Sequence, residues 1–257
     1  MKKYFAYLFL CAFLCSINLC SEVYASPTDA NVSAISLSMK YKDISYKIRV
    51  INKMKAQAKK LSDEEKGVIQ KYIYGAVKGE DTFLLINCNL RNTLEYYIPK
   101  KEVTKPLKCR LDFYADSLAQ PILKTELPQN MILYRGVDEK GMSLIFVDKN
   151  IKDVLYKPVN EENLAILRQK LVGTKFEDKG FMSTSYNKNC AKQTKFMFEV
   201  CAPKKLKAIL LEDLGKRAEK EVLINKDTKW EITEITKEYN KNTKQDCYKL
   251  RIKYSLK

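Results

Sequence analysis

The stretch CYKLRIKYSL, residues 247–256, decides the fold class. Apolar and aromatic side chains occupy every second position and would share one face of a strand: Tyr248, Leu250, Ile252, Tyr254 and Leu256. The positions between them are mostly basic: Lys249, Arg251 and Lys253. This alternation is typical of an antiparallel strand with one buried face and one solvated face. NKNTKQD, residues 240–246, predicts a turn before it, so we expect the chain to end in a hairpin.

Further apolar runs, each bounded by turn residues, fill the second half of the chain. They are MILYRGV (131–137), GFMSTSY (180–186), FMFEVCA (196–202), KAILLE (207–212) and EVLINKDTKWEITEI (221–235), the last broken at 225–228. The first half reads as helical. LSDEEKGVIQKYIYGAV (61–77) opens with a capping box of Ser62 and Glu65 and continues at helical spacing. Helix-like segments also cover 45–61, 81–94 and 109–123. Helices followed by a mostly antiparallel sheet predict the α+β class.

The N-terminus has the features of an export signal. Lys2 and Lys3 precede an apolar run over residues 4–15, and the segment closes with Val-Tyr-Ala at 23–25. The run is short for a membrane span, so we expect a signal peptide over 1–25 and a single secreted, extracellular domain over 26–257. A lipoprotein anchored at Cys20 is the alternative, although Leu19 stands where such signals carry a small residue. No later segment is apolar enough to cross a membrane.

Composition excludes several functions. The chain carries 47 Lys and Arg against 31 Asp and Glu, a net charge of +16. The lysines are scattered as on a solvated surface, apart from KPLKCR (105–110) and APKKLK (202–207). They form no interleaved basic and aromatic patch, so no nucleic-acid partner is expected. The chain has no histidine, which excludes Ser-His-Asp and Cys-His catalysis and His-bearing zinc sites.

Five cysteines follow the predicted signal, at positions 88, 109, 190, 201 and 247. None has CxxC spacing, so a metal cluster is not expected. Up to two disulfides could form in an exported protein. The sequence leaves the pairing of Cys88, Cys109, Cys190, Cys201 and Cys247 open.

LYRG, residues 133–136, is the first of three candidate site motifs. An arginine at the end of a buried strand is costly unless it is paired. Arg135 is well shaped to hold a phosphate through two parallel N–H bonds, and Gly136 would let a ligand approach the backbone. The alternative is a structural arginine bonded to a carboxylate or to carbonyls.

The other two motifs are GFMSTS (180–185) and EKEVLI (219–224). Alternation places Ser183 and Ser185 on one strand face, although hydroxyls within a sheet often only bond to a neighbouring strand. Glu219 and Glu221 would lie about 7 Å apart on one face of a strand. Paired carboxylates commonly break glycosidic bonds. Ordinary edge-strand charge is the alternative for this pair.

In this order and with these flanks, the motifs resemble the mono-ADP-ribosyltransferase toxins of the arginine-serine-glutamate class, of the clostridial exoenzyme and binary-toxin enzymatic-component type. The resemblance extends from about residue 45 to the end and includes KYIYGAVKGEDTFLLINCNLRNTL (71–94). It implies the ADP-ribosyltransferase fold, in which N-terminal helices pack on a mostly antiparallel two-sheet β core. It also implies NAD as co-substrate and no metal.

The resemblance assigns cofactor-binding roles to five residues. Arg135 and Arg91 would bind the NAD phosphates, and the backbone of Gly136 would contact the nicotinamide amide. Asn87 and Tyr134 are the further cofactor-binding candidates. Several relatives carry another NAD-binding arginine after the Ser-Thr-Ser strand; this chain has none there, and Lys195 is the candidate substitute.

The resemblance also assigns catalytic roles. Ser183 would hold Glu221 by a hydrogen bond. Glu221 would bond the ribose 2′-hydroxyl and stabilise the oxocarbenium ion as nicotinamide leaves. Glu219 would orient the acceptor and take its proton. A glutamate at that position goes with arginine acceptors in this family, and a glutamine with enzymes that modify asparagine on Rho GTPases.

We therefore expect an NAD:protein-arginine ADP-ribosyltransferase that acts on an actin-like or another host protein. The turn EDLGKRA (212–218) lacks the aromatic residue often seen there, which leaves the target open. We expect a monomer that uses a separate translocation partner or another entry route. The alternatives are an NAD glycohydrolase and a non-catalytic basic secreted binding protein on the same fold.

Overall fold

The computed structural model describes residues 47–77, 79–146, 149–215 and 220–255. The expected signal peptide, Cys20 and Glu219 therefore lie outside the described residues. The chain divides into two compact units, Met1–Arg49 and Val50–Lys257, and the fold below is that of the second unit. No helix in the described part is both long and apolar enough to cross a membrane.

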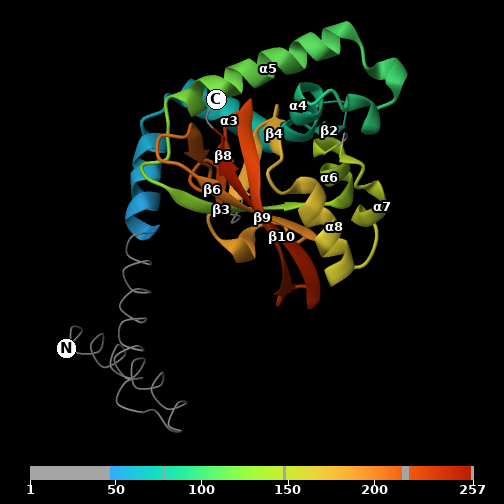
Figure 1. Ribbon diagram of the computed structural model, residues 1–257. Coiled ribbons are helices and arrows are strands. Elements are labelled where there is room, and N and C mark those ends of the chain that lie inside the picture. The colour runs from blue at the N-terminus through green and yellow to red at the C-terminus, as the bar shows by residue number, and fades with distance from the viewer. Residues whose placement is uncertain (1–46, 78, 147–148, 216–219, 256–257) are drawn as a thin grey trace, which may run out of the picture. The chain divides into compact units, whose positions relative to one another are not determined.

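The second unit is built on an eight-stranded sheet with the order β4-β9-β10-β6-β3-β5-β8-β7 (Figure 1). The strands are β3 (Met131–Val137), β4 (Lys175–Asp178), β5 (Met182–Ser185), β6 (Phe196–Ala202), β7 (Ala208–Leu210), β8 (Glu221–Ile224), β9 (Thr228–Asn240) and β10 (Gln245–Tyr254). Neighbouring strands are antiparallel except β10 and β6, which are parallel. The α+β class with a mostly antiparallel core is confirmed.

The sheet falls into two parts that meet at a narrow junction. β3 pairs with β6 over seven residue positions, but it pairs with β5 only at Tyr134 and Ser185. Five strands lie on one side of this junction and three on the other. The two sheets expected for the β core are thus connected through a single residue pair.

The C-terminal hairpin forms as expected. β9 and β10 pair from Asn240 and Gln245 onward, with residues 241–244 as the turn. Tyr248, Leu250 and Ile252 are fully buried, whereas Arg251 and Lys253 are exposed. The other edge of β10 lies parallel to β6, which places the last strand in the interior of the sheet.

The helices expected in the first half are present. The structure has a helix over residues 47–59, then α3 (Asp63–Tyr74), α4 (Thr82–Leu90) and α5 (Lys105–Leu123). The capping box forms, because Ser62 N–H donates to Glu65 Oε2 at 2.9 Å and Glu65 N–H donates to Ser62 Oγ at 3.2 Å. α5 begins four residues earlier than the apolar pattern indicates. Thr104 caps it, and a proline is tolerated in a first helical turn.

Three helices in the second half escaped the sequence analysis, which treated that half as strand-rich. They are α6 (Glu139–Ile145), α7 (Lys152–Leu155) and α8 (Glu161–Leu171), all between β3 and β4. α8 has a clear start signal, since Asn160 Oδ1 accepts from the Asn163 N–H at 2.8 Å. Short segments complete the fold: β1 (Ala76–Val77), β2 (Glu80–Asp81), η1 (Leu94–Tyr96), η2 (Lys100–Glu102) and η4 (Lys188–Cys190).

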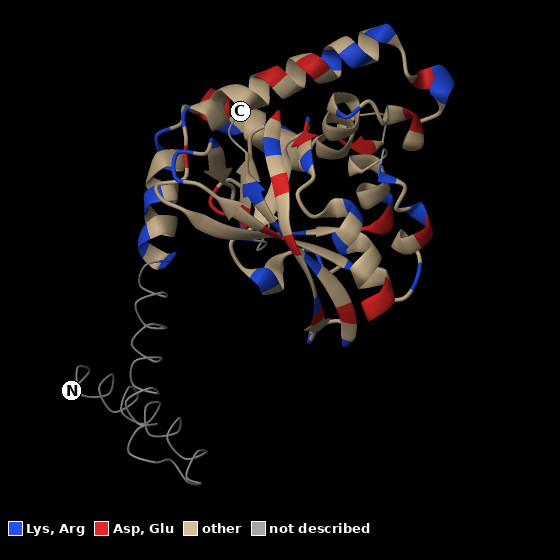
Figure 2. Cartoon of the chain, in the orientation of Figure 1, with Lys and Arg blue, Asp and Glu red and all other residues tan. Residues whose placement is uncertain are grey.

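Two apolar cores lie on opposite faces of β8. Val222 and Ile224 belong to the larger core, which β3, β6, β9 and β10 share with α7 and α8. Leu223 belongs to the second core, which is formed mainly by α3, α4 and α5. Charged residues cover the outside, and Figure 2 shows lysine and arginine spread over many elements among acidic residues.

Candidate active site

A cleft of about 830 Å³ opens where β3 and β5 part from each other. It lies between these strands, the start of β8 and the C-terminal end of α4. Seven residues proposed for the site from the sequence line it: Asn87, Arg91, Tyr134, Arg135, Gly136, Ser183 and Glu221. Segments up to 134 positions apart in the sequence are thus brought together, and only Glu219 lies outside the described residues.

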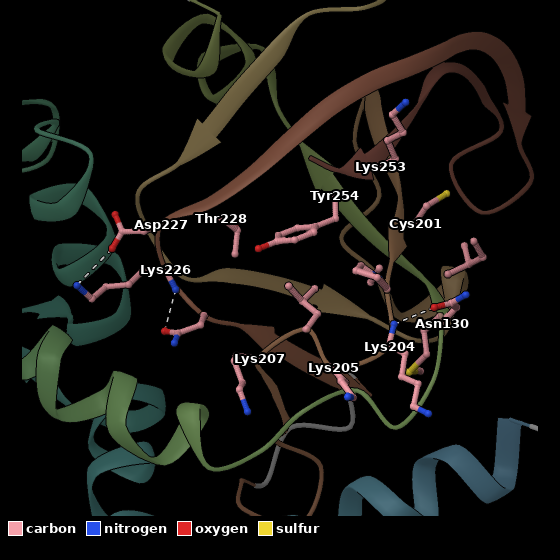
Figure 3. A pocket seen from close by; sticks show the side chains of 16 residues that line it. Asn130, Cys201, Lys204, Lys205, Lys207, Lys226, Asp227, Thr228, Lys253 and Tyr254 are labelled. Atoms are coloured by element: carbon pink, nitrogen blue, oxygen red, sulfur yellow. Dashed lines mark hydrogen bonds and ion pairs between the residues drawn. The ribbon is translucent and has the colours of Figure 1, made fainter. Parts of the chain in front are cut away.

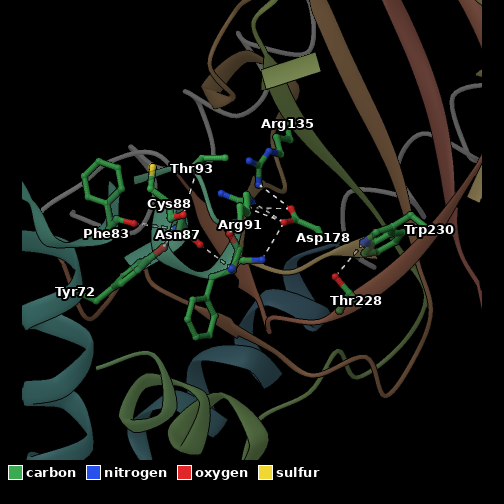
Figure 4. Close-up of polar contacts among 12 residues, drawn as sticks. Tyr72, Phe83, Asn87, Cys88, Arg91, Thr93, Arg135, Asp178, Thr228 and Trp230 are labelled. Atoms are coloured by element: carbon green, nitrogen blue, oxygen red, sulfur yellow. Dashed lines mark hydrogen bonds and ion pairs between the residues drawn. The ribbon is translucent and has the colours of Figure 1, made fainter. Parts of the chain in front are cut away.

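Arg91 is held by a carboxylate that sequence reasoning missed. It follows the last residue of α4, and its guanidinium donates from Nε to Asp178 Oδ1 at 2.8 Å and from Nη2 to Asp178 Oδ2 at 3.1 Å (Figure 4). Nη2 also donates to the Phe181 carbonyl at 3.4 Å. Burial alone would lower the pKa of Arg91, but the charge of Asp178 and these bonds raise it. This two-point pairing fixes the plane of the guanidinium group.

Arg135 shares the same carboxylate but is bound less completely. Its Nη1 lies 3.9 Å from Asp178 Oδ2, beyond hydrogen-bond distance, and is buried with no hydrogen-bond partner. Burial lowers the pKa of Arg135, and the nearby Arg91 lowers it further. A buried guanidinium nitrogen without an acceptor is costly unless a ligand supplies one. Arg135 therefore offers the cleft a donor for an anionic ligand.

Asn87 links α4 to α3 and to the residue that precedes β5. Its Nδ2 donates to the Tyr72 hydroxyl and to the Phe83 carbonyl, both at 2.9 Å, and its Oδ1 accepts from the Phe181 N–H at 2.7 Å. These contacts fix the segment that leads into β5. The expected contact of Asn87 with a cofactor stays a prediction.

Gly136 is required by the chain itself. A Cβ at this position would lie 1.9 Å from the carbonyl oxygen of Lys192 and 2.7 Å from Thr194 Oγ1. Segment 192–194 therefore passes directly over the Gly136 backbone. Close approach by a ligand is the role expected of this glycine from the sequence, and the structure adds a second reason for it.

The register of β5 against β8 arranges the hydroxyl groups. Ser185 lies opposite Glu221, and Ser183 lies opposite Leu223. Thr184 points to the other face, where its Oγ1 donates to the Val222 carbonyl at 2.6 Å. Ser183 is exposed and lines the cleft together with Glu221. The two share one strand face, and the catalytic role of Ser183 stays a prediction.

Glu221 is a buried carboxylate on the α4 side of the sheet. It is the first residue of β8 and is 9 % exposed. Leu223 faces the core formed by α3 to α5, so Glu221, two positions earlier, faces the same side. Burial and the charge of Glu221 raise the pKa of Tyr72, and Glu221 also acts on Arg135. Two arginines and two carboxylates therefore share one electrostatic environment.

The segment before residues 216–219 is tied to the helix over 47–59. Lys55 Nζ lies 3.2 Å from Glu212 Oε2 and 3.3 Å from Asp213 Oδ1. The hydroxyl of Tyr186, just after β5, donates to Glu212 Oε2 at 3.2 Å. Burial and the charge of Glu212 raise the pKa of Tyr186 to about 12, so this hydroxyl remains a donor at neutral pH. Residues 212–213, which precede the segment that carries Glu219, are thus bound by the side chains of Lys55 and Tyr186.

Lys195 does not enter the cleft. Its Nζ donates to the carbonyls of Leu155 and Lys157 and lies 4.0 Å from Glu139. Lys192 is the lysine of this segment that lines the cleft. The sequence-based choice of Lys195 as a substitute cation is therefore wrong, because short contacts with α7 and its end draw the side chain away.

The cysteines form no disulfide within the described part of the chain. Cys88, Cys109, Cys190, Cys201 and Cys247 are all free thiols in the structure. Among described residues, no group of three or more cysteines or carboxylates is arranged to hold a metal ion.

Solved structures share this architecture. Plx2a, an ADP-ribosyltransferase toxin from Paenibacillus larvae, matches with 23 % identity and a TM-score of 0.62, over 84 % of this chain and 96 % of that one. C3stau2 from S. aureus, solved with NAD, matches with 17 % identity and a TM-score of 0.62, over 82 % and 94 %. The ADP-ribosylating toxin BECa of C. perfringens, solved with NADH, matches with 20 % identity and a TM-score of 0.63, over 82 % and 48 %.

The fold is therefore that of the ADP-ribosyltransferase toxins. The family model of the ADP-ribosyltransferase exoenzymes matches residues 40–252, and the chain belongs to this family. A search of curated proteins finds no match. The resemblance read from the three sequence motifs is confirmed.

Proposed function

We propose that this protein is a secreted enzyme that transfers ADP-ribose from NAD to an arginine of a host protein and releases nicotinamide. One observation carries the NAD site: buried Arg135 Nη1 has no hydrogen-bond partner in a cleft that also contains the buried carboxylate of Glu221. A dinucleotide has phosphate oxygens that can accept from Arg135 Nη1. Its ribose develops the positive charge that the carboxylate of Glu221 can stabilise. The NAD and NADH present in the C3stau2 and BECa structures support this choice.

The proposed reaction uses the side chains in distinct roles. Arg135 donates to the pyrophosphate, while Asp178 holds Arg91 in a fixed plane beside it. The bond between the ribose C1′ and the nicotinamide nitrogen breaks, and its electron pair leaves with nicotinamide. Glu221 stabilises the positive charge that develops on the ribose. An acceptor guanidinium nitrogen then attacks C1′, and Glu219 takes the proton that this nitrogen loses.

The acceptor assignment depends on Glu219. The resemblance associates a glutamate at this position with arginine acceptors, and a carboxylate suits the cationic acceptor because opposite charges attract. We propose that the enzyme acts as an extracellular monomer delivered by a separate translocation partner or by another route. Water as acceptor, the glycohydrolase alternative, uses the same Arg135 and Glu221.

Release of nicotinamide from labelled NAD tests the proposal, with and without the arginine analogue agmatine. We expect label on agmatine from the natural enzyme and from Glu95→Gln, an exposed control with the same loss of charge. Glu221→Gln should lose both transfer and release, and Glu219→Gln should lose transfer alone. Turnover that survives in Glu221→Gln would overturn the proposal, and so would an absence of release under every condition.

A further inference from the structure

A second cavity, of about 850 Å³, lies beside the start of β3 (Figure 3). It is lined by the start of β3, the end of β6, the loop 203–207, the turn 225–227 and the end of β10. Met131 and Ile132 of β3 line this cavity, and the same strand lines the cleft from Tyr134 onward, but the two linings share no residue. The APKKLK motif, which the proposed function does not use, forms one wall.

The charged groups of this cavity are almost all cationic. Five lysines line it: Lys204, Lys205, Lys207, Lys226 and Lys253. Asp227 is the one carboxylate among its lining residues, all of which are described. That carboxylate already lies 3.5 Å from Lys226 and 3.7 Å from Lys179. The charge that a ligand meets is therefore mainly positive, although apolar side chains such as Met131, Ile132 and Leu206 also line the cavity.

Two of the lysines have no acidic partner in the described part of the chain. Lys207 lies 3.2 Å from Glu126, Lys226 lies 3.4 Å from Asp116, and Lys253 lies 3.4 Å from Glu231. The ammonium groups of Lys204 and Lys205, which are adjacent in sequence and exposed, form no such pair. Neighbouring like charges repel each other unless an anion lies between them.

The backbone that carries these two lysines is fixed in place. Lys204 N–H donates to Asn130 Oδ1 at 2.8 Å, and Lys205 N–H donates to the Leu127 carbonyl at 2.8 Å. The Leu127 N–H in turn donates to the Leu206 carbonyl at 2.9 Å. A loop that is ordered before binding loses less conformational entropy when a ligand arrives.

We propose that this cavity binds a polyanion that carries several phosphate groups. Phosphate oxygens are acceptors, so they match the ammonium donors of the five lysines, and lysine is a common phosphate ligand. The cavity is much larger than one phosphate ion needs, which favours a ligand with several such groups. Inositol phosphate headgroups of a membrane and soluble polyphosphates share this chemistry. The site is separate from the NAD cleft and does not depend on the proposed transfer reaction.

Two probes distinguish the sources. Inorganic tripolyphosphate is titrated calorimetrically into the full chain, and cosedimentation is measured with phosphatidylcholine vesicles with and without phosphatidylinositol bisphosphate. The proposal expects at least one probe to bind at 150 mM salt. Binding of tripolyphosphate alone indicates a soluble ligand, and binding to the bisphosphate vesicles alone indicates a lipid headgroup.

The matched variants distinguish binding in this cavity from nonspecific electrostatic attraction to a chain with net charge +16. Lys204→Glu/Lys205→Glu should weaken binding at least tenfold, and the neutral pair Lys204→Gln/Lys205→Gln should weaken it by less. Lys100→Glu/Lys101→Glu changes the total charge equally at two exposed lysines outside the cavity and should bind almost normally. Thermal midpoints check that each variant is folded.

Equal weakening in both charge-reversal variants would overturn the proposal, because overall charge would then explain the binding. Full binding by the Lys204→Glu/Lys205→Glu variant would overturn it as well. So would the failure of both probes to bind the natural chain. If the reversed pair were unfolded, the neutral pair takes its place: a loss of affinity supports the cavity, and full affinity overturns it.

Discussion

At the scale of single residues, the sequence identified which side chains would gather but not what holds them. Arg135, Glu221 and their neighbours were proposed from short motifs, and they line one cleft. Asp178 was missed because its partner Arg91 is 87 positions away, and nothing local marks the contact. The available signal was indirect: two arginines expected in a buried site require a carboxylate nearby.

Asp178→Asn should destabilise the protein by about 3 kcal/mol, because it leaves two partly buried arginines without their shared counter-ion. It should also weaken NAD binding, since Arg91 loses its fixed plane. Chemical denaturation and NAD titration measure the two effects. Asp153→Asn, an exposed residue with the same chemical change, should alter neither. Equal stability of both variants would contradict a structural role for Asp178.

Gly136→Ala and Gly67→Ala should have opposite effects on stability. At Gly136 the new methyl group would lie 1.9 Å from the Lys192 carbonyl, so segment 192–194 must move and the free energy of unfolding should fall. At Gly67, within α3, no atom lies within 4 Å of the new methyl group. Alanine there should stabilise the protein by roughly 0.5–1 kcal/mol. Thermal or urea unfolding compares them directly.

At the scale of elements, the bounds of a helix or strand could be predicted where turn residues flank it. The bounds of β3 and β6 agree with their apolar runs, because turn residues bracket both. α6 and α7 were missed because they are short, with seven and four residues, whereas α8 was missed although Asn160 marks its start. The parallel pairing of β10 with β6 was not predictable from local pattern, since register between distant strands depends on the packing of the whole core.

Lys55→Ala should separate transfer from hydrolysis. The change removes two contacts that hold the entry to the segment carrying Glu219, but it leaves Arg135 and Glu221 in place. We expect label transfer to a protein acceptor to fall several-fold while nicotinamide release in water changes little. Lys53→Ala, two positions earlier and exposed, is the control. A parallel loss of both activities would argue against a role restricted to acceptor positioning.

At the scale of the whole molecule, the cleft lies where the sheet is least continuous. Two cores and two groups of strands meet there, and one residue pair joins β3 to β5. The sequence predicted a core in two parts but not that a single pair would connect them. A ligand that contacts both parts should therefore stabilise the entire fold.

NAD should raise the unfolding temperature of Glu221→Gln, a variant chosen so that NAD is not consumed. At 100 times its dissociation constant, NAD should add about 2.7 kcal/mol to the free energy of unfolding. Arg135→Ala in the same background should abolish the increase, because the pyrophosphate loses its buried donor. An equal increase in the two proteins would place the nucleotide elsewhere.

The interior position of β10 has a consequence for the order of folding. β10 lies third in the sheet, between β9 and β6, so one edge of each neighbour stays unpaired until residues 245–254 are in place. A chain that lacks residues 245–254 cannot complete the larger part of the sheet, and contacts between distant segments form slowly. The β4–β9 pair and the β6–β3 pair therefore become one continuous sheet only when β10 is inserted between them.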